Sequence, residues 1–189
     1  MKFDYIIIGA GSAGCVLANR LTNNNQNKVA VFEAGVASDI WKVKMPLALL
    51  YTMHDPKYNW KYYSEPEPHL HNRKLFCPRG KMIGGCSSHN GMVFVRGNKN
   101  DYERWKNFGL KSWSYEKILP YFKKIENWSG GENQYRGSFG LLPVNQSKND
   151  NPLFKAFLGA ASEAGHKINP DMIQQSTNFN LFEITELIN

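Results

Sequence analysis

The sequence predicts an α/β fold built around a Rossmann-like, FAD/NAD(P)-binding βαβ unit at the amino-terminal end. Two short apolar runs, at residues 5–8 and 29–32, are predicted to be strands, and the helix-like segment 15–21 lies between them. A glycine-rich turn at residues 9–14 joins the first strand to the helix, and Glu33 follows the second strand. Strand, tight glycine turn, helix, strand and terminal acid in this order form the dinucleotide-binding fingerprint.

The residue types of this turn suit a dinucleotide pyrophosphate. Gly9 permits a sharp exit from the strand, Gly11 has no side chain to block a phosphate, and Gly14 lets the helix pack closely on the sheet. Ser12 is a further candidate cofactor-binding residue of the turn. The free N–H groups at the start of the helix that follows face the phosphates. Glu33 is placed to accept hydrogen bonds from the adenosine ribose, and its charge argues against the 2′-phosphate of NADP. The alternative to nucleotide binding is a glycine-rich turn in an ordinary βαβ unit. If a dinucleotide binds, this motif alone does not distinguish NAD from FAD.

Composition indicates a globular protein and excludes several partner classes. The 189 residues suit one domain, or one domain and part of another, and 42% are hydrophobic and 13% aromatic. The net charge of +7 is scattered without a basic block, so no nucleic-acid partner is expected. The first apolar run is too short to span a membrane or to act as a signal peptide. Three cysteines without metal-ligand spacing fit a reducing compartment, so a cytoplasmic location without membrane contact is expected.

Residues 36–68 have poor periodicity and many aromatic side chains. Four prolines interrupt any long element, so we expect an irregular excursion with a short helix near 47–53 and a strand near 60–64. An aromatic box for a ligand is one interpretation of this stretch. Core packing of the aromatic residues against the nucleotide domain is the preferred one.

A second glycine-rich stretch, RGKMIGGCSSHNGMVFVRG, occupies residues 79–97. Its small residues make sense where backbone must approach a flat or charged ligand closely. Two such stretches in one chain, one for a pyrophosphate and one for a planar group, fit the long bipartite cofactor FAD better than NAD. The candidate cofactor-binding residues here are Gly80, Gly84, Gly85, Ser87, His89, Asn90 and Gly91.

The pair of motifs GAGSAG…FEAG and RGKMIGGCSSHNGMVFVRG resembles the glucose–methanol–choline (GMC) family of FAD-dependent alcohol oxidoreductases. The resemblance continues through residues 101–105, the helix-like segment 114–128, and residues 136–144 and 151–171. It implies that residues 1–171 form the amino-terminal part of a GMC-type FAD-binding domain with the start of the substrate region. Residues 172–189 show no such resemblance and are interpreted as a divergent tail.

Two residues of the second motif depart from the usual family pattern, Cys86 and His89. The string GGCSSHN is similar to choline-oxidising members of the family, in which the histidine at this position is joined covalently to the flavin. The resemblance therefore implies that His89 is a candidate attachment residue. The alternative is that His89 occupies the usual aliphatic position and forms local hydrogen bonds.

The resemblance also predicts what is missing. Family members abstract the hydride with the help of a histidine, paired with a histidine or an asparagine, near the end of a much longer chain. No position here matches, and ordinary surface or loop roles are expected for the remaining histidines, His54, His69, His71 and His166. The strand at 5–8 also lacks the neighbour that the carboxyl-terminal part of the family provides.

We therefore expect a truncated GMC-type protein, incomplete at its carboxyl-terminal side, that is inactive alone and binds FAD weakly or not at all. No catalytic residue and no metal site are predicted. One alternative is an enzyme half completed by a separately encoded carboxyl-terminal GMC fragment, which would then act on a small alcohol. The other is a stand-alone FAD-binding module.

Overall fold

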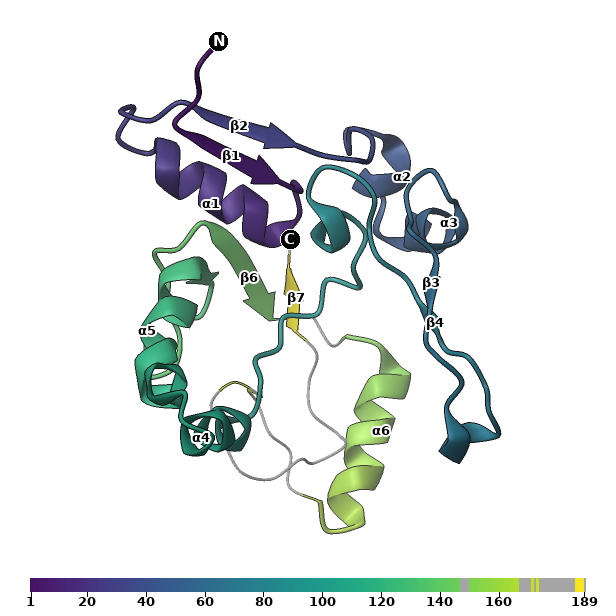
Figure 1. The fold of residues 1–189 in the computed structure, drawn as a ribbon. Coiled ribbons are helices and arrows are strands. Elements are labelled where there is room, and N and C mark those ends of the chain that lie inside the picture. Colours follow the sequence, from purple (N-terminus) through teal and green to yellow (C-terminus); the bar gives the residue numbers. More distant parts are fainter. Residues whose placement is uncertain (147–149, 167–170, 172, 174–185, 189) are drawn as a thin grey trace. The chain divides into compact units, whose positions relative to one another are not determined.

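The computed structural model describes residues 1–146, 150–166, 171, 173 and 186–188 (Figure 1). The chain forms two compact units, Met1–Gly91 and Met92–Asn189. The predicted division into residues 1–171 and a tail at 172–189 stays a prediction, and most of that tail lies outside the described residues.

The first unit begins with the predicted βαβ element. Strand β1 (Tyr5–Ile8) is followed by helix α1 (Ser12–Thr22) and strand β2 (Val29–Phe32). The two strands pair in parallel, with Tyr5 opposite Val29 and Ile8 opposite Phe32. Both predicted strands are confirmed, and the helix starts three residues earlier than expected because the end of the glycine turn forms its first turn.

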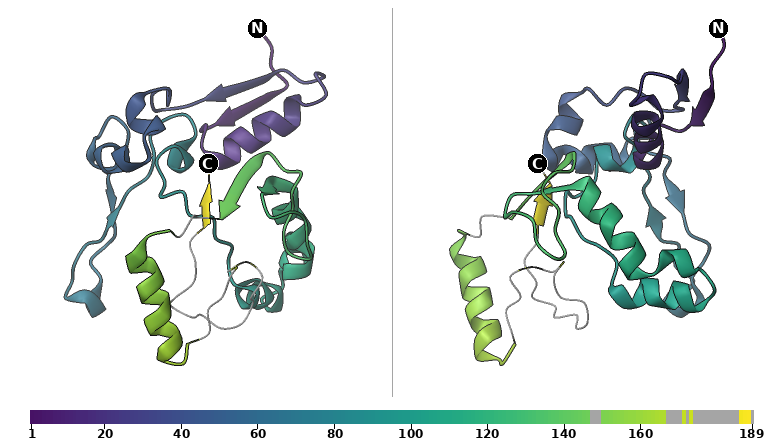
Figure 2. Two further views of the ribbon diagram at one scale, coloured as in Figure 1. Left: turned by 180° about the vertical axis from the view of Figure 1, so that it is seen from behind. Right: turned by 90° about the vertical axis from the view of Figure 1, so that its left-hand side faces the viewer.

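One face of β1 is covered and the other is open. Figure 2 shows α1 along one side of the β1–β2 pair, and a Cβ atom on Gly14 of α1 would lie 3.3 Å from the Ile7 side chain. Ile7 is accordingly 8% exposed, whereas Ile6 is 62% and Ile8 81% exposed. Among the described residues, β1 pairs with β2 alone. The strand therefore presents an unpaired, apolar edge.

The rest of the first unit consists of short elements. They are α2 (Trp41–Lys44), η1 (Pro46–Ala48), α3 (Leu49–His54), β3 (Tyr62–Tyr63), η2 (Pro68–Leu70), β4 (Phe76–Cys77) and η3 (Gly85–Ser88). The short helix near 47–53 is confirmed as η1 and α3, and the strand near 60–64 is only two residues long. β3 and β4 pair antiparallel.

The expectation that the aromatic residues of 36–68 pack in a core is wrong for most of them. Tyr58 is 7% exposed, but the other five are between 41% and 66% exposed: Trp41, Tyr51, Trp60, Tyr62 and Tyr63. A two-stranded hairpin of two residue pairs offers too little apolar surface to cover such large rings. Some of these rings instead stack on their neighbours, as Trp60 does on Tyr62 with centroids 6.0 Å apart.

The second unit combines helices with a three-stranded sheet. Its elements are α4 (Lys99–Asn107), η4 (Lys111–Trp113), α5 (Tyr115–Ile125), β5 (Glu126–Trp128), β6 (Leu142–Gln146), α6 (Pro152–Glu163) and β7 (Glu186–Ile188). β6 pairs in parallel with β5 and antiparallel with β7. The helix predicted over 114–128 ends at Ile125, because the next three residues join the sheet and bury Glu126 and Trp128.

Ion pairs occupy the centre of the second unit. The guanidinium of Arg136 donates to Glu126 at 2.5 Å and to both carboxylate oxygens of Asp171 at 2.7 and 3.1 Å. Arg96 also pairs with Glu126, and the Arg136 guanidinium lies 4.3 Å from the centroid of the Trp128 ring. Arg136 and Glu126 are fully buried. These charges are mutually compensated, as buried charges must be.

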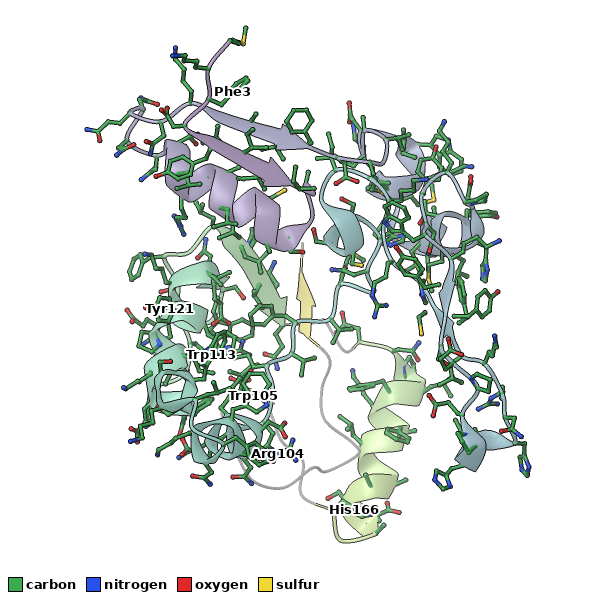
Figure 3. The ribbon with its side chains drawn as sticks, in the orientation of Figure 1. Phe3, Arg104, Trp105, Trp113, Tyr121 and His166 are labelled. Carbon is green, nitrogen blue, oxygen red and sulfur yellow. The ribbon has the colours of Figure 1, made fainter. Side chains whose placement is uncertain are left out.

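Aromatic side chains of α4, η4 and α5 gather beside this centre. Figure 3 shows Trp105, Trp113 and Tyr121 on these neighbouring elements. They contribute to the lining of a mainly apolar cavity of about 560 Å³. No helix in the described part of the chain is long and apolar enough to cross a membrane.

Candidate functional site

The glycine turn after β1 has the geometry that its sequence predicts. Gly9 has a φ of +94°, a region that favours glycine, and its N–H donates to the Phe32 carbonyl at 2.7 Å. A Cβ atom on Gly14 would lie 1.9 Å from the Gly9 carbonyl oxygen. The chain can therefore turn from β1 directly into a closely packed helix only with glycine at both positions.

Open space lies in front of this turn. A Cβ atom at Gly9 or Gly11 would meet no atom within 4 Å. Gly11 is the N-cap of α1 and provides no side-chain cap, and Ser12 at the first helical position is exposed. The first helical hydrogen bond of the turn is donated by Cys15 to Gly11 at 2.9 Å, so the N–H groups of residues 12–14 precede it. This end of α1 can accommodate an anion.

Glu33 ties the end of β2 to the glycine turn. Its Oε2 accepts the N–H of Ala10 at 2.7 Å, and its Oε1 accepts the N–H of Gly35 at 2.9 Å. The carboxylate is half-buried. Each oxygen can still accept a further hydrogen bond, because a carboxylate offers about four lone-pair sites. Glu33 is thus held in place and remains able to bind ribose hydroxyls.

The second glycine-rich stretch lies directly against the first. The Gly84 N–H donates to the Ala10 carbonyl at 2.7 Å. A Cβ atom on Gly85 would lie 2.9 Å from the Gly11 Cα atom, and one on Gly80 would lie 2.3 Å from the Gly85 carbonyl oxygen. The structure therefore brings together Gly11, Gly80, Gly84 and Gly85, and each close approach is backbone to backbone.

Hydroxyl groups hold the turn that follows. Ser87 Oγ donates to the Gly84 carbonyl at 2.7 Å, and Ser88 Oγ donates to the Ile83 carbonyl at the same distance. The predicted residues Asn90 and Gly91 are exposed at the end of the first unit. Ser87 thus shapes the turn through its own backbone contacts.

His89 lies at the end of η3 and is 8% exposed. Its backbone N–H donates to the Cys86 carbonyl at 3.2 Å. Its Nδ1 atom is buried and has no hydrogen-bond partner among the described residues. Burial lowers the pKa of the imidazole from its ordinary value of 6.5, because desolvation disfavours the charged form. Burial therefore favours the neutral form of the ring, which keeps a nitrogen lone pair.

The other histidines are exposed, as the sequence predicts. His69, His71 and His166 lie outside the α-helices and strands, whereas His54 lies in α3 and stacks on Phe76 with centroids 5.5 Å apart. None of these four side chains is buried in a cleft where a catalytic base would be expected.

Sequence reasoning missed Asn59, which is 2% exposed. Its Oδ1 accepts the N–H of Lys61 at 2.7 Å and that of Arg79 at 3.1 Å. No motif marks this residue, because its importance depends on a chain segment twenty positions away. The adjacent bridge between Asn59 and Gly80 places it beside the second glycine-rich stretch.

Comparison with known protein families identifies the family to which the chain belongs. The GMC oxidoreductase profile matches residues 3–180. The chain belongs to the GMC oxidoreductase family. The match covers both glycine-rich stretches and extends beyond residue 171, where the recognisable resemblance was expected to end.

The chain is similar to several curated proteins named oxygen-dependent choline dehydrogenase. The chain is 51% identical over 172 residues to the oxygen-dependent choline dehydrogenase of Sinorhizobium fredii, a match that covers 90% of this chain and 31% of that protein. It is 47% identical over 166 residues to the enzyme of the same name from Vibrio vulnificus, covering 87% of this chain and 30% of that one. The chain spans about a third of the length of these curated relatives.

Solved GMC-type structures share the fold. Pyridoxine 4-oxidase from Mesorbium loti superposes with a TM-score of 0.78 at 30% identity, covering 86% of this chain and 32% of that chain. The R554K variant of Aspergillus oryzae formate oxidase superposes with a TM-score of 0.81 at 26% identity, covering 93% of this chain and 33% of that chain. The fold is therefore that of the amino-terminal part of GMC oxidoreductases.

Proposed function

We propose that this chain forms the FAD-binding part of a GMC oxidoreductase that acts on a small alcohol of the choline type. The observation that carries the proposal is the hydrogen bond of 2.7 Å from Gly84 to Ala10, which joins the two glycine-rich stretches into one cradle. The relatives named choline dehydrogenase support the choice of alcohol.

The residues of the first unit fit FAD. The open space at Gly11 and the free N–H groups of α1 would hold the pyrophosphate. Glu33 would accept hydrogen bonds from the adenosine ribose, and the backbone around Gly84 and Gly85 would lie against the isoalloxazine ring. When bound, FAD supplies the hydride acceptor, and the protein contributes position and electrostatics.

His89 is the candidate residue for covalent attachment of the flavin at its C8α-methyl carbon. Such a bond requires a neutral imidazole with a free nitrogen lone pair, and the lowered pKa of His89 and its unpartnered Nδ1 support this form of the ring. Acid denaturation of the FAD-loaded complex of this chain with the carboxyl-terminal part of a GMC relative tests the attachment. Yellow colour in the protein pellet, which the His89→Leu variant loses to the supernatant, is the expected result. Colour found entirely in the supernatant for the unmodified chain excludes the bond.

We further propose that this chain, taken alone, binds FAD weakly and oxidises no alcohol. The general base and the substrate cavity would come from a further carboxyl-terminal part, on the same polypeptide or encoded separately. The unpaired edge of β1, with exposed Ile6 and Ile8, supports this view, since a buried parallel strand normally has a neighbour on each side. The coverage of about a third of the relatives supports it as well.

The experiment measures FAD binding and alcohol-dependent bleaching of the flavin, with and without the carboxyl-terminal part of the Sinorhizobium fredii relative. Binding that tightens and bleaching that appears only when both parts are present is the expected result. The Gly11→Ala variant is the matched control, because its new methyl group meets open space in the protein but would obstruct a pyrophosphate. Alcohol oxidation by this chain alone contradicts the proposal. Stable, stoichiometric FAD without turnover favours the stand-alone FAD-binding module.

A further inference from the structure

We propose that Asn59 is the positioning residue that sets the second glycine-rich stretch against the glycine turn. It would do so through its side-chain oxygen, without touching the cofactor. The consequence for FAD binding rests on the function proposed above, but the positioning itself is a property of the chain without FAD. Neither the family motifs nor the curated relatives' names mark this residue.

The Asn59 side chain joins two segments that are distant in sequence. Its Oδ1 accepts one N–H from Lys61 and one from Arg79, at 2.7 and 3.1 Å. Backbone hydrogen bonds flank this contact, from Trp60 to the Arg79 carbonyl at 2.9 Å and from Lys81 to the Tyr58 carbonyl at 2.8 Å. Asn59 therefore determines the position of the chain at Gly80, its antiparallel bridge partner.

Gly80 and Gly11 are linked through Gly85 by close approaches of the backbone. A Cβ atom on Gly80 would lie 2.3 Å from the Gly85 carbonyl oxygen, and one on Gly85 would lie 2.9 Å from the Gly11 Cα atom. These are contacts between backbones, which cannot yield as a flexible side chain can. A shift of the segment at Gly80 therefore moves Gly85 relative to Gly11.

The oxygen of the Asn59 side-chain amide, and not its nitrogen, forms the hydrogen bonds that join the two segments. Its orientation is determined by the two N–H donors, because a flipped amide would place its NH₂ group against both of them. The Nδ2 atom is then buried and has no hydrogen-bond partner in the described part of the chain. A buried unpaired donor reduces stability, so the structure keeps the acceptor oxygen at the expense of the donor. An aspartate can replace this acceptor, and a leucine of similar size cannot.

Hydrogen exchange in the full chain without FAD tests the positioning. The reporter is the Gly84 amide, which bonds to Ala10, and the internal reference is the set of amides in β1 and β2. Asn59→Leu is expected to speed exchange at Gly84 by about tenfold relative to the reference. Asn59→Asp keeps the acceptor oxygen but buries a carboxylate, and it is expected to speed this exchange less than Asn59→Leu does. Thr52→Val is the matched control, since Thr52 is also buried but, among the described residues, its hydroxyl donates within α3, to the Leu49 carbonyl at 2.9 Å.

Three outcomes would overturn the proposal. The first is that exchange at the Gly84 amide is unchanged in Asn59→Leu. The second is that the Gly84 amide exchanges as fast in Asn59→Asp as in Asn59→Leu. The third is that the amides of β1 and β2 accelerate in Asn59→Leu as much as the Gly84 amide does. The third outcome would mean that Asn59 stabilises the whole first unit and does not position one segment. A variant that fails to fold belongs to this outcome.

FAD titration provides the second measurement. The dissociation constant is expected to rise about tenfold in Asn59→Leu and to rise less in Asn59→Asp, which keeps the acceptor oxygen. If FAD binds neither to the unmodified chain nor to its complex with the carboxyl-terminal part, the proposed function fails, and the exchange at Gly84 still decides the role of Asn59. If FAD binds and both variants bind it equally well, the link between Asn59 and the cofactor is wrong.

Discussion

Both backbone polar groups of Ala10 form hydrogen bonds of 2.7 Å: its carbonyl accepts the N–H of Gly84, and its N–H donates to the Glu33 carboxylate. The glycine turn, the acid at the end of β2 and the second glycine-rich stretch therefore meet at one buried residue, which is 6% exposed. A displacement of any of the three segments would change the shape of the cradle.

Substitutions at Gly14 and Gly11 should separate folding from cofactor binding. Gly14→Ala is expected to destabilise the first unit by about 1–3 kcal/mol, because the new methyl group would lie 1.9 Å from the Gly9 carbonyl oxygen. Gly11→Ala should change stability by less than about 0.5 kcal/mol but weaken FAD binding. Urea unfolding followed by circular dichroism measures the first effect and flavin fluorescence the second. Equal stability of the two variants would contradict the geometry of the turn.

Adjacent residues of β1 should respond differently to truncation. Ile7 faces α1 and is 8% exposed, so Ile7→Ala should cost about 2–5 kcal/mol. Ile8 is 81% exposed, so Ile8→Ala should cost less than about 0.5 kcal/mol in this chain. Chemical denaturation of both variants measures the difference. If a carboxyl-terminal part covers β1, Ile8→Ala should weaken complementation, and an unaffected complementation would argue against an interface at that edge.

Burial of His89 should make the first unit sensitive to acid. The folded chain holds the proton less tightly than the unfolded chain, whose imidazole pKa is the ordinary 6.5. The contribution to stability is therefore complete above pH 6.5 and is lost as the pH falls through the lower pKa of the folded state. The His89→Leu variant should lack this part of the pH dependence of the unfolding free energy.

Nuclear magnetic resonance can follow the His89 ring directly. The same resonance in the urea-unfolded chain is the control, and its titration should return to the ordinary range. A folded His89 that titrates at or above the unfolded value would contradict the burial that the structure shows.

Removal of Arg136 should strongly destabilise the second unit. Arg136→Leu leaves the buried carboxylates of Glu126 and Asp171 without their shared partner, which should cost about 3–5 kcal/mol. Arg104→Leu is the matched control, because Arg104 pairs with Asp101 on the surface and should change stability by less than about 0.5 kcal/mol. Tryptophan fluorescence, to which Trp128 against the Arg136 guanidinium contributes, can follow the unfolding. Similar losses in both variants would mean that the buried ion pairs contribute no more than an exposed one.

The local elements were predictable where a short motif dictates them. Glycines at positions 9 and 14 and the apolar runs of β1 and β2 define the βαβ unit with nearly correct bounds. The sequence was misleading where long-range pairing competes with helical periodicity. The residues from Glu126 to Trp128 continue a helical pattern, yet they pair with β6 and leave the helix.

The amino-acid sequence by itself determined the family, the glycine turn and the residue types that suit a dinucleotide, because these depend on neighbours within a few positions. Only the tertiary structure decided that the Gly84 N–H donates to Ala10, that Asn59 accepts the N–H of Arg79 and that His89 is buried. The reason is physical: hydrogen bonding and desolvation at these residues depend on backbone segments that are far apart in the chain and adjacent only after folding.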